Sequence, residues 1–456
     1  MVPGPLHPVS IVEQDHISPS PAPVADQPRA LPLTFFDLVF WEFPPVQRLF
    51  FYDNADLVDV PDFQASELPR FKKSLAAALH HFYPLAGRLT CELAEGVVPE
   101  IAFSDGDSVQ LTVAVSSDDF HDLAGDHARD AARLRPLLPS LPKYGGGGSA
   151  SHDVLAVQVT VFPGAGVCVG TTVHHAVADG SSYVHFMKTW AAIHRSASPE
   201  CRNVLAPLFD RSVVRDDAGL REAFVSEIVA ADGRRLGDWD LSQRPGVVLA
   251  TFRFTEKQLN KLGRHVGSET SARCSPNALA CGAAWAGVVH ARGSAASCFG
   301  FVTGCKPRAS PPIPANYFGN CLGLCRVEAP NIKQGGGGLT AAAAATAVWR
   351  VIEELAEEGS AFRDARGWVR LVREYASRRA VTVAGSPKLG VYAVDFGAPW
   401  GRPRKVEIAS VERTGALALA ESGRDGDGGI EVGLALPRAE MEAFRAFHRD
   451  LFASLN

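Results

Sequence analysis

The sequence predicts an α/β fold in which short buried strands alternate with amphipathic helices. Residues 153–173 are rich in Val, carry polar residues at alternate positions, and contain a Pro-Gly pair that is typical of a turn between two strands. The apolar residues that follow have helical spacing: Val184, Met187, Trp190 and Ala191. Near the C-terminus, alternation over residues 430–436 precedes a last helix with an apolar stripe over residues 441–452. Strands and helices mix in both halves, so the pattern is α/β or α+β and not a repeat protein.

Composition limits the class of protein. The chain has 456 residues, 46% of them hydrophobic and 21% charged, as expected of a globular protein with about two to three domains. A net charge of −5 and the lack of a Lys/Arg cluster argue against a nucleic-acid partner. The nine Cys have no paired spacing and are expected to be reduced thiols of a cytoplasmic protein.

No membrane segment is expected. The Pro-rich N-terminus lacks the apolar core of a signal peptide. Residues 154–173 are apolar, but Gln158, Pro163 and three Gly interrupt them, so we predict no transmembrane helix and no membrane partner.

The first half contains six predicted features before the strand pair of residues 153–173. They are an extended arm (1–30), an apolar segment with a turn at Asp37 (31–37), a helix (68–82), a turn into a strand (85–89), short strands with a helical stretch around 118–134 (90–140), and a glycine loop (145–148).

The second half follows a charged stretch, residues 196–245, with few periodic segments. A structureless loop of that length is uncommon inside one compact domain. We therefore predict an N-terminal domain (1–195), a crossover segment (196–245) and a C-terminal domain (246–456). The predicted elements of the latter are a strand (247–254), a helix from Thr255, a buried helix (277–291), an Ala-rich helix after a glycine run at 335–338, and the strand and helix at the C-terminus.

The central motif is His174-His175-Ala176-Val177-Ala178-Asp179-Gly180, in the short connection between a buried strand and the helix that Ser181 or Ser182 is expected to cap. A His at such a place can remove a proton from a hydroxyl near neutral pH. His175 is the better candidate, whereas His174 is expected to point the other way. Spacing alone leaves two possibilities for Asp179, which could touch the imidazole or anchor the loop to a cationic partner.

Other chemistry has little support in the sequence. A bare H-x-x-x-D is more often structural than catalytic. No H-E-x-x-H motif or paired Cys supports a zinc site, so no metal is predicted. No G-x-S-x-G elbow or Walker-type loop is present.

Several stretches together resemble the plant BAHD acyltransferases, which transfer acyl groups from coenzyme A thioesters. The central motif matches H-x-x-x-D-G, and Asp395-Phe396-Gly397-Ala398-Pro399-Trp400-Gly401 resembles D-F-G-W-G with two inserted residues. Tyr317-Phe318-Gly319-Asn320-Cys321 matches Y-F-G-N-C, the marker of the subgroup that acylates anthocyanins and other flavonoid or phenolic glucosides. Further similar stretches are residues 31–37, 81–88 and 209–212.

This resemblance implies a two-domain, chloramphenicol acetyltransferase-like fold with mixed sheets flanked by helices, a long crossover loop, and a channel between the domains. It implies His175 as the general base in a ternary complex, with no acylated residue and no bound cofactor. It also implies that Asp179 supports the His loop by pairing with a basic residue. Lys306 or Arg308 is the candidate, where relatives usually carry two Arg.

The resemblance further suggests residues that contact acyl-CoA or the acceptor: Thr34, Gly180, Tyr317, Asn320, Asp395, Gly397, Trp400 and Gly401. The loop of residues 395–401 is expected to hold the coenzyme-binding region in shape, with Trp400 more often a packed aromatic than a substrate platform. Whether Tyr317 and Phe318 are more than core residues stays open.

The donor implied by the resemblance is malonyl-CoA or a hydroxycinnamoyl-CoA. Residues 384–388, Ala-Gly-Ser-Pro-Lys, look more like the malonyltransferases, so malonyl is favoured, with the glucose 6-hydroxyl as acceptor. A monomer is expected. A catalytically inactive binding protein on the same fold and a thioester hydrolase are the two rival hypotheses.

Overall fold

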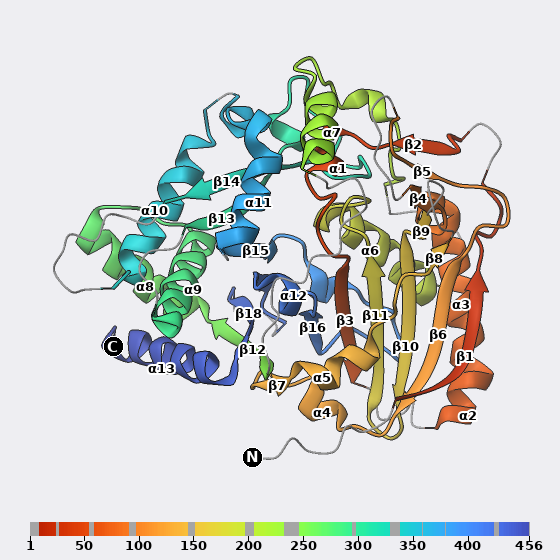
Figure 1. Cartoon of the computed structure of the whole chain (residues 1–456). Helices are drawn as coiled ribbons and strands as arrows, with labels where there is room; N and C mark the ends of the chain where they lie inside the picture. The colour runs from red at the N-terminus through yellow and green to blue at the C-terminus, as the bar shows by residue number, and fades with distance from the viewer. Residues whose placement is uncertain are drawn as a thin grey trace.

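The computed structural model describes residues 9–23, 27–53, 59–90, 97–144, 151–196, 205–231, 246–293, 298–328, 338–357, 359–378, 380–423 and 428–455. Within them the fold is α/β, as predicted, with mixed sheets flanked by helices (Figure 1). The predicted loop at 145–148 and most of the glycine run at 335–338 lie outside the described residues.

The first sheet is formed mainly by the N-terminal half and has six described strands, in the order β1-β6-β10-β11-β3-β16. Their bounds are Val9–Ile17 (β1), Val109–Ser116 (β6), Leu155–Phe162 (β10), Gly166–Val173 (β11), Val46–Asp53 (β3) and Lys405–Ile408 (β16). The predicted hairpin is confirmed, since β10 and β11 pair antiparallel along their whole length. Every residue of both strands is buried, because they occupy the centre of the sheet.

Two long helices belong to this half and pack against each other: α3 (Leu68–His81) and α6 (Gly180–Ser196). The predicted N-terminal arm, residues 1–30, contains an edge strand of the sheet among its described residues. β1 pairs with β6 at the edge of the sheet. The expected turn at Asp37 is a short helix, α1 (Phe35–Leu38), because Thr34 and Asp37 form a capping box at its start.

The second sheet is formed mainly by the C-terminal half and has seven described strands, in the order β14-β13-β15-β17-β18-β12-β7. Their bounds are Leu322–Val327 (β14), Phe299–Gly304 (β13), Val381–Gly385 (β15), Leu417–Glu421 (β17), Ile430–Pro437 (β18), Val247–Phe254 (β12) and Arg129–Asp130 (β7).

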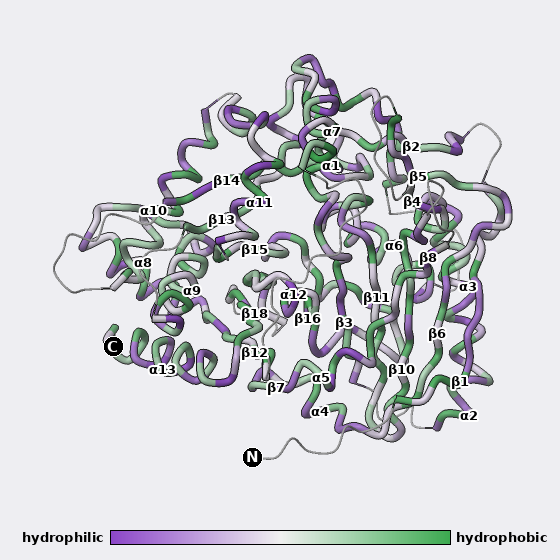
Figure 2. Tube along the Cα trace, in the orientation of Figure 1, coloured by the Kyte–Doolittle hydropathy of each residue, from purple (hydrophilic) through white to green (hydrophobic). Residues whose placement is uncertain are grey.

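Helices of the second half pack on this sheet and on one another: α8 (Glu256–Thr270), α9 (Pro276–Arg292), α10 (Ala341–Glu354) and α13 (Arg438–Ser454). All four correspond to predicted helices. Figure 2 shows polar and apolar residues alternating along α13, whose buried side chains include Met441 and Phe444. Two shorter helices, α11 (Trp368–Arg378) and α12 (Val411–Thr414), complete this half.

Two strands pair across the predicted domain boundaries. β16, from the C-terminal half, pairs with β3 of the first sheet, and β7, from the N-terminal half, pairs with β12 of the second. A buried ion pair joins them, with Arg129 Nη2 at 2.8 Å from Glu407 Oε2 and both side chains at most 2% exposed. The division into two domains stays a prediction, and these exchanged strands tie its two halves together.

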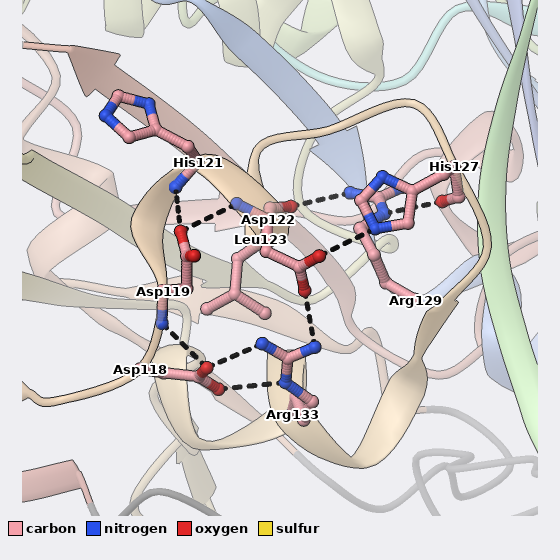
Figure 3. Close-up of polar contacts among 8 residues, drawn as sticks. All are labelled: Asp118, Asp119, His121, Asp122, Leu123, His127, Arg129 and Arg133. Atoms are coloured by element: carbon pink, nitrogen blue, oxygen red, sulfur yellow. Dashed lines mark hydrogen bonds and ion pairs between the residues drawn. The ribbon is translucent and has the colours of Figure 1, made fainter. Parts of the chain in front are cut away.

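A polar cluster supports Arg129 (Figure 3). Its guanidinium also donates to the carbonyls of Leu123 and His127, while Arg133 bonds to the carboxylates of Asp118 and Asp122. The cluster orders residues 118–133, which run through α4 (Phe120–Leu123), β7 and α5 (Ala131–Leu134). It therefore fixes the point where the N-terminal half joins the second sheet.

A third, smaller sheet of five described strands has the order β2-β5-β4-β9-β8. Its strands are Ala30–Pro32, Glu100–Ala102, Arg88–Thr90, Ser151–Asp153 and Lys143–Tyr144. The predicted crossover contains a helix, α7 (Leu220–Ala230), among its described residues. Leu220, Phe224 and Ile228 lie four residues apart and are buried, so one face of α7 packs on the core.

Across the described ranges, seven cysteines are free thiols. None of the helices described there has the length and apolar composition needed to cross a bilayer. Nor does any group of three metal-binding side chains occur in those ranges.

Candidate active site

His175 lies between the end of β11 and the start of α6. Its imidazole stacks on the Phe40 ring, with centroids 3.9 Å apart and planes inclined by 8°. Phe43 is the second aromatic neighbour, at 5.8 Å. These contacts restrict rotation of the imidazole, which a positioned base requires.

A cavity of about 450 Å³ adjoins His175. Its wall combines the first sheet, through Val46, Arg48 and Val173, with the second sheet, through Val383 and Ala435. The cavity therefore lies where the two large sheets face each other. A pocket lined by two different sheets suits a reaction that must hold two substrates together.

Burial controls the charge of His175. It lowers the pKa of the imidazole to about 4, and neighbouring Arg48 acts in the same direction. The backbone carbonyl of His175, the Asp179 charge and the Asn320 side chain raise this pKa, but they offset burial only in part. Nδ1 is buried without a hydrogen-bond partner. The ring is thus neutral at pH 7 and can accept a proton.

Asp179 caps helix α6. Its Oδ1 accepts from the backbone N–H of Ser182 at 2.9 Å and from the Ser181 hydroxyl at 2.8 Å. The predicted cap at Ser181 or Ser182 is therefore wrong, because the helix begins at Gly180 and places both serines inside its first turn. Asp179 is 3% exposed and its hydrogen bonds lead away from the imidazole.

Residues 317–321 hold this loop from the other side. Oδ2 of Asp179 accepts from the N–H of Cys321 at 3.2 Å, and the Ser182 hydroxyl donates to the carbonyl of Gly319 at 2.9 Å. Asn320 Nδ2 donates to the carbonyl of His175 at 2.9 Å and to Asp37 Oδ1 at 3.0 Å. Asn320 consequently fixes the backbone of the candidate base.

Two cations support the same loop. Arg211 Nη1 donates to the Tyr317 hydroxyl at 2.6 Å and to the Phe318 carbonyl at 2.8 Å. Lys306 donates to the Tyr317 carbonyl at 2.7 Å and to the Ser181 hydroxyl at 3.4 Å.

The ion pair expected for Asp179 is not found in the described part of the chain. Its partners are main-chain N–H groups and the hydroxyl of Ser181, and Lys306 reaches it only through that hydroxyl. Arg308 instead donates to backbone carbonyls. The N-cap position explains this difference, because the first-turn N–H groups of α6 already satisfy the carboxylate.

Residues 395–401 form a closed loop at the far end of α6. Asp395 Oδ1 accepts from the N–H of Gly397, and its Oδ2 lies 3.2 Å from Arg195 in the last turn of the helix. Gly397 has a φ of 73°, and a Cβ there would lie 2.5 Å from the Arg195 side chain. Helix α6 thus has the His175 loop at its start and the loop of residues 395–401 at its end.

Trp400 is a packed aromatic. It is 2% exposed, stacks on Phe71 with centroids 5.2 Å apart, and donates from Nε1 to Glu67 Oε2 at 3.0 Å. These contacts support the interpretation of Trp400 as part of the core rather than as a platform for substrate.

Of the residues predicted to be catalytic or to contact a substrate, His175, Asp179 and Gly180 line the cavity. The other residues predicted to contact a substrate lie outside its described wall: Thr34, Tyr317, Asn320, Asp395, Gly397, Trp400 and Gly401. Thr34, Tyr317 and Asn320 belong to the contacts that support the His175 loop, whereas residues 395–401 pack at the other end of α6. Their direct contact with a substrate stays a prediction that these positions do not favour.

Phe40, Phe43 and Arg48 line the cavity but were not predicted as site residues. The aromatic run at residues 35–43 was a signal for the first two, since so many rings close together need a common packing partner. The signal for Arg48 was a charged residue inside an apolar strand sequence.

Comparisons with known proteins identify the family of the chain and its structural neighbours. The Transferase family model matches residues 7–450. The chain is 34% identical over 453 residues to the malonyl-CoA:anthocyanidin 5-O-glucoside-6''-O-malonyltransferase of Arabidopsis thaliana, covering 96% of each chain. It is 33% identical over 468 residues to the coumaroyl-CoA:anthocyanidin 3-O-glucoside-6''-O-coumaroyltransferase 2 of the same plant, again covering 96% of each. Its fold is similar to that of vinorine synthase, with a TM-score of 0.70 at 19% identity over 96% of each chain.

Proposed function

Because this chain belongs to the Transferase family of BAHD acyltransferases, we propose that it transfers a malonyl group from malonyl-CoA to a glucose hydroxyl of a phenolic glucoside. The observation that carries this proposal is a neutral, stacked His175 at a cavity between the two large sheets. The acceptor class includes flavonoid and anthocyanin glucosides, with the 6-hydroxyl as the position acylated.

In this mechanism His175 removes the proton of the acceptor hydroxyl as its oxygen attacks the thioester carbonyl. The buried Nδ1 leaves Nε2 as the nitrogen that accepts this proton. The tetrahedral intermediate then expels the coenzyme A thiolate, which takes the proton back from the imidazolium. No protein residue is acylated, so both substrates must be bound at once.

The rest of the loop positions the base. Asp179 fixes the start of α6, and Asn320 binds the His175 carbonyl. We propose that these residues act through the position of the imidazole and do not contact the reacting atoms. The enzyme is further proposed to be a cytoplasmic monomer.

The donor is the point on which the relatives differ, because they include both malonyl- and coumaroyltransferases. Two observations favour malonyl. Residues 384–386, which begin the malonyltransferase-like stretch, line the cavity, and so does the cation of Arg48. Hydroxycinnamoyl transfer to the same acceptors is the alternative.

The test offers malonyl-CoA and coumaroyl-CoA in parallel to flavonoid and simple phenolic glucosides, with product mass and free thiol both followed. The expected result is a mass gain of one malonyl group that depends on the acceptor and is lost in His175→Ala. An aromatic acyl product would show that the donor is a hydroxycinnamoyl-CoA and not malonyl-CoA. Thiol release without an acceptor would make the protein a hydrolase, and inactivity with every donor and acceptor would favour a binding protein.

A further inference from the structure

Arg48 has an unusual place for a charged residue. It lies within β3, opposite Thr171 of β11 and Ile408 of β16, and is only 5% exposed. Side chains two positions apart on a strand share a face, so Val46 and Arg48 both point to the cavity, and the structure places both in its wall. The guanidinium of Arg48 therefore lines the same cavity as His175.

The guanidinium of Arg48 has no anionic partner in the described ranges. Its Nε and Nη1 are buried without hydrogen-bond partners. Its nearest contact is the Tyr183 ring, 4.7 Å from the guanidinium carbon, while Glu421 attracts it from beyond ion-pair distance. Burial lowers the pKa of Arg48. A buried, unpaired cation is costly to a fold, so its presence here needs an explanation.

The other described cations of the cavity wall are already engaged. Lys306 donates to the carbonyls of Ala315 and Tyr317, and Arg292 lies 3.6 Å from Glu440. Arg48 differs from both because the described chain gives it no oxygen to bind. A ligand that supplied a carboxylate would satisfy it.

We propose that Arg48 binds the free carboxylate of the malonyl donor and so selects malonyl-CoA over acyl-CoA donors with uncharged acyl groups. This inference rests on the proposed function. A guanidinium matches a carboxylate through paired N–H donors. In malonyl-CoA a single methylene separates the carboxylate from the thioester carbonyl, so the cation must share a cavity with His175. The Nη2 atom lies 3.8 Å from where a Cβ on Gly180 would stand, beside the loop that carries His175.

The experiment measures kcat/KM with malonyl-CoA and with acetyl-CoA, which differs only by lacking the carboxylate. In Arg48→Met the ratio of the two values should fall by about 10- to 100-fold, as expected for loss of a charge-assisted hydrogen bond. Arg48→Lys keeps the charge but lacks the paired N–H donors of a guanidinium. Its ratio should lie between those of the wild type and Arg48→Met. Arg292→Gln is the matched control, because it removes a paired guanidinium from the same cavity, and it should leave the ratio unchanged.

Unfolding of the apo protein separates this role from a structural one. Removal of an unpaired buried cation should not lower the urea midpoint of Arg48→Met. Equal losses with both donors, or a clearly lower midpoint, would overturn the inference. If the wild type accepts only hydroxycinnamoyl donors, the proposed function fails as well. If it uses malonyl-CoA and the variant keeps the wild-type ratio, only the role of Arg48 is refuted.

Discussion

Asp179 provides the sharpest test of how the fold holds its base. Substitution by Asn preserves an oxygen for the Ser182 N–H, and Asn caps helices as well as Asp does. It replaces the oxygen that accepts from Cys321 with an amide donor, and removes the charge. We expect a cost of about 2 kcal/mol, the usual value for a lost hydrogen bond to a charged group.

Substitution of Asp179 by Ala removes the cap as well. A lost N-cap adds about 1 to 2 kcal/mol, so Ala should cost roughly 3 to 4 kcal/mol. Activity should follow the same order, with kcat/KM falling about 100-fold or more in Asp179→Ala, because a displaced imidazole is poorly aligned for attack.

The assay combines urea unfolding, followed by tryptophan fluorescence, with kcat/KM for the proposed substrates. Asp119→Ala is the matched control, since Asp119 caps α4 through the N–H groups of His121 and Asp122 and lies in another part of the fold. It should lower the midpoint slightly and leave activity intact. The reasoning is refuted if the Asn and Ala variants of Asp179 unfold at the same midpoint, or if Asn behaves as wild type.

Three further predictions concern the pH dependence set by His175, the Phe40–His175 stack and the buried Arg129–Glu407 ion pair. Protonation disables the base, so kcat/KM should stay level down to about pH 5 and fall as the pH drops through about 4, the pKa of His175, whereas a midpoint near 6.5 would contradict its burial. The unfolded chain takes up this proton first, with a pKa of 6.5, so stability also falls from pH 6.5 towards 4, and circular dichroism at each pH separates the two effects. Phe40→Ala should lower kcat/KM about three- to tenfold by releasing the stacked imidazole, and an unchanged rate would show that the stack does not position it. Arg129→Met should cost about 3 to 5 kcal/mol in urea unfolding, and much of this should return in Arg129→Met/Glu407→Leu; equal midpoints of the single and double variants would contradict the coupling.

The elements that the sequence predicted well are those with a strong local pattern. The hairpin of residues 153–173 and the strand of residues 247–254 could be recognised because short apolar runs, rich in Val and bounded by turn residues, are typical of strands. The helix after Thr255 begins as predicted, since Thr255 and Gln258 form a capping box that is visible in the sequence.

The errors at the central motif have one local and one distant cause. The sequence offered two serines as caps for α6, yet Asp179 takes that place. A cation was expected as the partner of Asp179, but one of its oxygens is bound by the N–H of Cys321, far along the chain. Local spacing cannot encode such a contact, because it depends on how the Tyr317–Cys321 loop folds back onto the motif.

Residue patterns alone were enough to predict the strands and helices with a strong period, the motif that carries His175 and the resemblance to a family. Each of these depends on residue types at short, fixed spacings, which backbone geometry converts directly into strands, helices and loops. Only the tertiary structure decided what the motif faces. Phe40 and Arg48 lie eight residues apart in the N-terminal half and Asn320 lies far along the chain, and their approach to His175 results from sheet register and packing between the two halves. Burial then lowers the pKa of the base and leaves Arg48 without a partner, because both effects depend on the exclusion of water and not on neighbours in sequence.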